Sequence, residues 1–89
     1  MSEQMSDQEK EAKLKEFFEK ARKGVLQYLN EKGGSLSLGE LHEYSLNKFF
    51  IQHQRFSQLM ESLVGENLIE FDQMTQVSTI TGKGKEFIK

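Results

Sequence analysis

Few residues in this sequence have the side chains and the spacing that chemistry requires. Its two histidines, His42 and His53, are eleven positions apart, no cysteine is present, and no cluster of carboxylates lies near either imidazole. That pattern supplies neither a metal-ligand set nor a nucleophile with its base. Glu40 and Glu43 are expected to be solvated charges, and the run Gly82–Lys85 lacks the G-x-x-x-x-G-K-S/T spacing of a phosphate-binding loop. We therefore expect no enzyme, no metal site and no cofactor.

The bulk properties of the chain indicate one small domain. Its 89 residues are enough for a single core. We expect residues 1–5 to be disordered and residues 6–89 to form the domain. The net charge of −2 argues against a protein that coats nucleic acid without sequence preference. A cytoplasmic location is expected, because the N-terminus is unlike a signal peptide, no apolar run reaches the ~20 residues that span a bilayer, and cysteine is absent.

The elements that must position any site begin with a long helix. Ser6 and Glu9 have the S-x-x-E spacing of a capping box at a helix start. Apolar residues then recur at helical spacing over Leu14–Leu29, and Gly33-Gly34 is a signal for the end of the helix. Gly24 could bend this helix or break it into two, because glycine costs about 1 kcal/mol in a helix interior relative to alanine.

A short strand and two more helices follow. Ser35–Ser37 alternates in the manner of an edge strand, and Ser37 can cap a second helix that begins at Leu38. Residues 44–51 either continue this helix to about residue 49 or form a loose turn. A third helix has its apolar residues at i, i+3, i+4 and i+7, namely Phe56, Leu59, Met60 and Leu63. Gly65 or Asn67 ends it.

The C-terminal quarter of the chain predicts a hairpin and a last short helix. Residues 68–71 have the pattern of a strand, residues 72–76 that of a polar turn, and residues 77–81 that of a returning strand. Residues 82–88 form the terminal helix. The whole order is helix, short strand, helix, helix, hairpin, short helix. It predicts an α+β, mostly helical fold with three core helices, a small antiparallel hairpin, an N-terminal helical extension and a short C-terminal helix.

Several local strings in this order resemble the winged-helix branch of the helix-turn-helix superfamily, in general pattern the MarR-, ArsR- and PadR-like regulators. The strings are VLQYL at 25–29 before KGG at 32–34, LSLGEL at 36–41, LMESLVGENLIE at 59–70 and ITGKGKEF at 80–87, which has the form T-x-x-G-x-x-F. The resemblance implies a winged helix-turn-helix fold whose hairpin is the wing. It also implies a small transcriptional regulator that binds double-stranded DNA with its third helix in the major groove.

The resemblance also implies which residues would contact DNA. On the third helix and its approach they are Lys48, Gln52, His53, Gln54, Arg55, Ser57 and Gln58. On the wing and the terminal helix the weaker candidates are Gln73, Thr75, Gln76, Lys83 and Lys85. Arginine can make two hydrogen bonds to guanine and glutamine two to adenine, so these side chains suit base reading. The alternative is that they form only the solvated face of a helix.

Tight DNA binding would call for a second copy of the chain, since few cations are placed to meet phosphates. The leading helix, with Phe17 and Phe18, is the expected homodimer element, unless it packs only on its own domain. Two features depart from the family pattern. The turn before Ile51 is long and lacks the usual small residue and glycine, and the wing turn carries Asp72 and no lysine or arginine. They leave open a winged helix that contacts protein, or serves as an accessory subunit, without binding DNA. No membrane partner is expected in either case.

Overall fold

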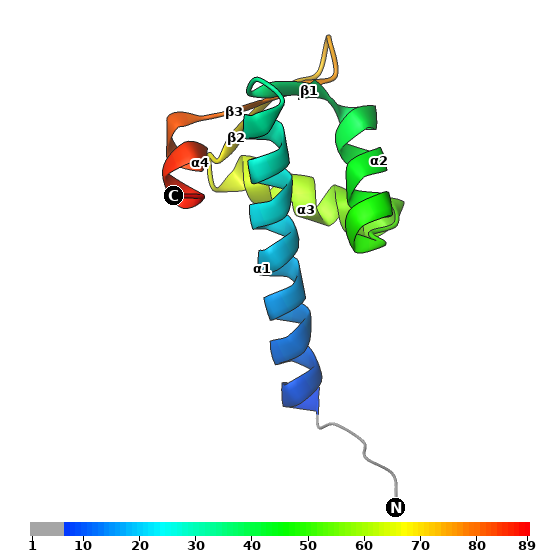
Figure 1. The fold of residues 1–89 in the computed structure, drawn as a ribbon. Helices are drawn as coiled ribbons and strands as arrows, with labels where there is room; N and C mark the ends of the chain where they lie inside the picture. The colour runs from blue at the N-terminus through cyan, green and yellow to red at the C-terminus, as the bar shows by residue number, and fades with distance from the viewer. Residues whose placement is uncertain (1–6) are drawn as a thin grey trace, which may run out of the picture.

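The structure is a computed structural model that describes residues 7–89, with side chains described from residue 12 onward. The elements of this part of the chain are α1 (Asp7–Glu31), β1 (Ser35–Ser37), α2 (Leu38–Phe49), α3 (His53–Gly65), β2 (Ile69–Asp72), β3 (Val77–Ile80) and α4 (Gly82–Phe87) (Figure 1). The predicted α+β class and the order of elements are confirmed. The expected disorder of residues 1–5 and the expected capping box of Ser6 and Glu9 lie outside the described residues.

Helix α1 is the centre of the core. Its inward stripe of Ala21, Val25, Leu26 and Leu29 is fully buried. The helix runs through Gly24 without the break that the sequence allows. A Cβ at this position would lie 2.5 Å from Cζ of Phe49 on α2, so the glycine lets the two helices approach closely.

The end of α1 and the start of α2 follow the predicted signals. Gly33 and Gly34 take positive φ angles of 99° and 93°, and the Gly34 N–H donates to the carbonyl of Leu29 at 2.9 Å. At α2 the Ser37 hydroxyl accepts from the Glu40 N–H at 3.2 Å, while the Glu40 carboxylate accepts from the Ser37 N–H at 3.4 Å. This capping box fixes the point at which α2 leaves the strand.

Helix α2 continues to Phe49, which is the first of the two predictions for residues 44–51. It ends at Phe50, which adopts the left-handed conformation with φ 57° and ψ 32°. Ile51 is buried, and Gln52 is the N-cap of α3, which therefore begins at His53. The predicted inward stripe of α3 is confirmed, and the helix ends at Gly65.

The sheet is antiparallel with the strand order β1-β3-β2, so the predicted edge strand at Ser35–Ser37 pairs with the far strand of the hairpin. In the hairpin, Ile69 pairs with Ile80. Strand β2 begins one residue later than predicted. Leu68 belongs to the turn after α3, where its N–H donates to the carbonyl of Leu63 at 2.9 Å.

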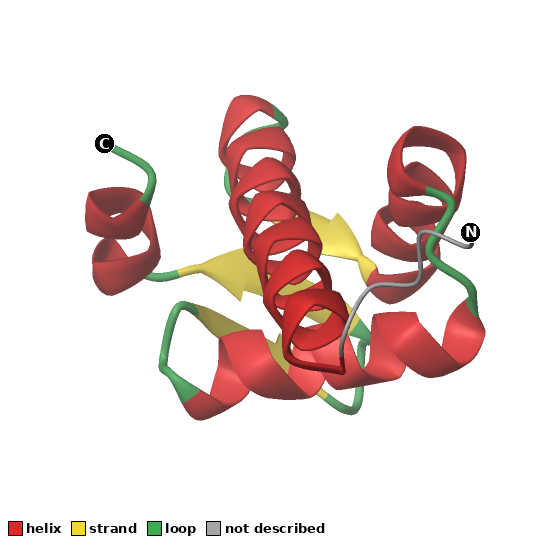
Figure 2. Cartoon of the chain, turned by 90° about the horizontal axis from the view of Figure 1, so that it is seen from below, coloured by secondary structure: helices red, strands yellow, loops and turns green. Residues whose placement is uncertain are grey.

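The helices surround one face of the sheet. Figure 2 shows α1 crossing in front of the sheet, with α2 and α4 on either side of it and α3 below. The N-terminal half of α1 projects beyond the other elements (Figure 1). None of the helices described over residues 7–89 combines the length and the apolar content needed to cross a membrane.

Candidate binding groove between α2, α3 and the hairpin

The described chain has a groove of about 770 Å³ bounded by the start of α2, one side of α3 and the β2–β3 hairpin. We call it the α3 groove. Its apolar lining consists of Leu38, Phe56, Met60, Val64 and Phe71. Its polar lining includes His42, His53, Ser57, Glu61, Gln73 and Gln76. An open, mostly apolar groove with a few polar groups is the usual form of a binding site.

Simple periodicities place these side chains. On α3, His53, Ser57, Met60 and Val64 follow the i, i+4, i+7, i+11 rule, so they form a second stripe that meets the buried one at Met60. On β2, Ile69 is buried and Phe71 half-buried, while the alternate residues are exposed. The alternation turns Phe71 toward the helices and leaves the acidic residues of the strand in solvent.

The two histidines are neighbours in the groove, which the sequence analysis missed. The His42 and His53 rings have centroids 5.7 Å apart, and the His42 ring also meets that of Phe56 edge-on at 4.9 Å. The His42 Nε2 atom is buried and has no hydrogen-bond partner in the described part of the chain. The available signal was the i, i+4 spacing of Leu38 and His42, which puts the imidazole on the inward side of α2. No group of three or more potential metal ligands is found among the described residues.

The groove takes in only some of the residues predicted to contact DNA. His53, Ser57, Gln73 and Gln76 line it. Gln54, Arg55 and Gln58 are exposed on α3 but do not line it. At about 100° of helical rotation per residue, Arg55 points roughly 160° away from Ser57.

The other predicted cations lie apart from one another. Lys48 is in the last turn of α2. Lys83 and Lys85 are on α4, which lies on the other side of α1 from α2 in both views (Figures 1 and 2). Because α3 runs from the α2 side toward the α4 side, these two lysines lie far from Arg55. The predicted cations therefore form no continuous basic surface along α3 and the hairpin.

The hairpin presents acids and amides. Asp72 accepts hydrogen bonds from the backbone N–H groups of Met74 at 2.8 Å and Thr75 at 3.4 Å, so its carboxylate shapes the turn. The Gln76 side-chain amide donates to the carbonyl of Gln73 at 3.1 Å. Thr75 is exposed in the turn. With Glu61 in the groove lining and no lysine or arginine among the lining residues, the local charge is negative.

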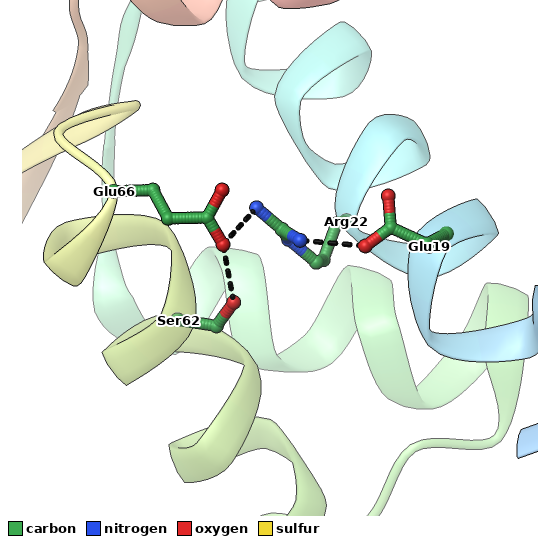
Figure 3. Close-up of polar contacts among 4 residues, drawn as sticks. All are labelled: Glu19, Arg22, Ser62 and Glu66. Carbon is green, nitrogen blue, oxygen red and sulfur yellow. Dashed lines mark hydrogen bonds and ion pairs between the residues drawn. The ribbon is translucent and has the colours of Figure 1, made fainter. Parts of the chain in front are cut away.

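One arginine that sequence reasoning did not single out is buried. Arg22 on α1 is 6% exposed and its Nη1 donates to the Glu19 carboxylate at 2.6 Å (Figure 3). Its Nη2 forms an ion pair with Glu66 at 2.7 Å, and the Glu66 carboxylate also accepts from the Ser62 hydroxyl at 3.5 Å. The ring of Phe87 on α4 lies 5.5 Å from the guanidinium. This cation ties the C-terminal end of α3 to α1 and is not exposed to a binding partner.

Comparisons of the chain with protein-family models, curated proteins and solved structures find no match. The groove and its surroundings therefore carry the functional inference.

Proposed function

We propose that this chain is a winged-helix module that binds a segment of a partner protein in the α3 groove. The winged-helix assignment is supported by the order α1, β1, α2, α3, β2, β3 and by the pairing of β1 with β3 of the hairpin. The closing Thr81-x-x-Gly84 string is part of the same resemblance. The observation that carries the binding role is the apolar lining of a groove that contains no lysine or arginine.

The groove defines the chemistry of the partner. Its floor of Phe56, Met60 and Phe71 suits two or three apolar anchor side chains, and a methionine can adapt its shape to them. One carboxylate, that of Glu61, lies in the lining, and the exposed acid Asp72 lies between the lining residues Phe71 and Gln73 of the hairpin. The partner segment is therefore apolar in its centre and basic at its ends, because complementary charge at the rim steers and orients association.

The same electrostatics disfavours a phosphate backbone at this place. A duplex held between α3 and the hairpin would meet Glu61 in the groove and Asp72 at the hairpin turn, and would gain one exposed cation on α3, Arg55. Affinity for DNA rests largely on phosphates neutralised by lysine and arginine. A protein segment makes better use of the surface.

The proposal is tested with two fluorescein-labelled amphipathic peptides that share leucine anchors and differ in their flanks, lysine in one and glutamate in the other. Anisotropy titrations of the full chain are expected to show binding of the lysine-flanked peptide only. Val64→Lys, which places a charge in the lining, is expected to weaken this binding about tenfold, which corresponds to ~1.4 kcal/mol.

The matched control is Leu46→Lys. Leu46 is 41% exposed and Val64 is 40% exposed, but Leu46 does not line the groove, so its substitution leaves the affinity unchanged. Equal binding of the two peptides, or equal effects of the two lysine substitutions, contradicts the proposal.

DNA binding by a transcriptional regulator is the second candidate. The observation that favours it is that His53, Gln54, Arg55, Ser57 and Gln58 are exposed on the first two turns of α3. Titration of a random-sequence duplex pool at low and high salt tests it. Binding that falls with salt and is lost in Arg55→Ala would support DNA, whereas absence of binding at low salt excludes it.

A further inference from the structure

The two histidines of the chain meet where α2 and the start of α3 line the α3 groove, and the proposed peptide site makes no use of them. His42 comes from α2 and His53 from the first turn of α3, and both line the groove. Their ring centroids lie 5.7 Å apart, with 66° between the ring planes. The sequence contains only these two histidines, so the fold places every imidazole of the chain at one point.

The Nε2 atom of His42 has no partner of its own. It is buried and makes no hydrogen bond in the described part of the chain, whereas most buried polar groups in proteins are paired. The ring also meets Phe56 edge-on, but a phenyl ring brings no nitrogen or oxygen atom to the contact. Because a neutral imidazole has one nitrogen with a free lone pair, the contact between His42 and His53 contains two lone pairs that can bind a metal ion.

The spacing of the two rings is close to that of two imidazoles on one metal ion. A zinc–nitrogen bond is about 2.0–2.1 Å long, so a tetrahedral zinc ion holds the centroids of two imidazole ligands about 5 Å apart. The observed separation is 5.7 Å. His53 is exposed, so rotation of its side chain between staggered positions is free to close the remaining difference.

We propose that His42 and His53 bind one divalent transition-metal ion, with water in its remaining coordination positions. Imidazole nitrogen is a ligand for zinc, copper and nickel, whereas magnesium and calcium prefer oxygen. The surroundings favour a cation, because the groove lining includes the Glu61 carboxylate and no lysine or arginine. The described chain supplies two ligands here instead of the four of a structural zinc site, so binding is reversible and a chelator removes the ion.

Isothermal titration calorimetry of the full chain with zinc chloride tests the proposal. One zinc ion is expected to bind per chain, and magnesium chloride is expected to give no binding heat. His42→Gln and His53→Gln should each weaken zinc binding about tenfold or more, because each removes one of the two ligands. His53 is exposed, so His53→Gln should keep the native melting temperature and carries the test even if His42→Gln lowers stability.

The matched control keeps two histidines and separates them. In the double variant His53→Gln/Gln54→His the second imidazole moves one position along α3, about 100° around the helix, to a residue that does not line the groove. This variant should bind zinc as weakly as His53→Gln does. A native chain that binds no zinc, single variants that bind it as tightly as the native chain, or a double variant with native affinity overturns the proposal. Peptide titrations in the presence of a chelator measure the groove without the ion, so this proposal and the proposed function fail independently.

Discussion

Replacement of Gly84 by alanine tests how the hairpin is joined to α4. The Thr81 hydroxyl donates to the carbonyl of Asn67 at 2.6 Å and accepts from the Gly84 N–H at 3.0 Å. This closes the turn after α3 onto the first turn of α4. Gly84 is buried there, and a Cβ on it would overlap the carbonyl oxygen of Leu68 and lie 2.8 Å from Cγ1 of Ile80. The T-x-x-G string therefore encodes one hydroxyl cap and one close approach.

The expected loss of stability follows from what the new methyl group would displace. Overpacking costs about 1–3 kcal/mol, and the upper end applies because the obstacle is a backbone carbonyl that accepts the Thr81 N–H at 3.0 Å. The better helix propensity of alanine recovers up to ~1 kcal/mol. The net loss is about 2 kcal/mol, which lowers the melting temperature of a domain of this size by roughly 8–16 °C.

Thermal and urea unfolding followed by circular dichroism measure this effect. Gly82→Ala is the matched control, because it lies in the same helix and a Cβ there meets no atom within 4 Å. It should leave the melting temperature unchanged or raise it slightly. A Gly84→Ala protein as stable as the Gly82→Ala protein would refute the close-approach explanation, since both variants gain the same helix propensity.

Three further predictions concern the helices that hold α3. Gly24→Ala should lower stability by about 1 kcal/mol in the native chain, where the new methyl group would meet the Phe49 ring. In a Phe49→Leu background, where a shorter side chain replaces that ring, the same substitution should raise stability by about 1 kcal/mol, as paired urea titrations would show. Arg22→Met keeps the packed stem of the side chain and leaves the two exposed carboxylates free to hydrate, so it should lower the free energy of unfolding by less than ~1 kcal/mol. Glu66→Ala removes a partner from a buried cation and should lower it by about 1–3 kcal/mol. The reverse order of the two losses in urea unfolding would contradict the role given to Arg22. Burial, with smaller contributions from neighbouring charge, raises the pKa of Tyr44. The stability that the neutral Tyr44 phenol contributes is therefore fully present below pH ~10 and is lost as the pH rises through the folded-state pKa. Tyr44→Phe should make the melting temperature fall less steeply with pH in the alkaline range, and an unchanged dependence on pH would exclude this cause.

Local signals in the sequence account for most of the fold. The cap of Ser37 on α2, the paired glycines after α1 and the stripe of α3 each depend on residues close together in the chain, and each is found as expected. The two alternatives for residues 44–51, a continued helix or a loose turn, could not be separated by local signals. Whether α2 continues depended on Phe49 finding a place against Gly24, a contact between residues 25 positions apart. Local propensity does not contain that information.

The site could be predicted only in part for the same reason. The sequence put His42 and His53 on different elements, and only the packing of α2 against α3 brings their rings together. The resemblance also grouped Arg55 with Ser57 as residues that would contact DNA, although the helix directs them to nearly opposite sides. Nothing near Arg22 in the sequence marks it as buried, because Glu66, one of the two partners that hold its guanidinium in the interior, lies 44 positions away.

The two candidate functions use different sides of one helix, and this makes them separable by experiment. Base reading would depend on Arg55, which does not line the α3 groove, whereas peptide binding would depend on Val64, which does. Because the two side chains point roughly 180° apart at about 100° per residue, neither substitution perturbs the other surface directly. A chain whose binding responds to Val64→Lys and not to Arg55→Ala uses the groove; the opposite response assigns the polar face of α3 to DNA. The acidic hairpin beside the groove makes the first result the expected one.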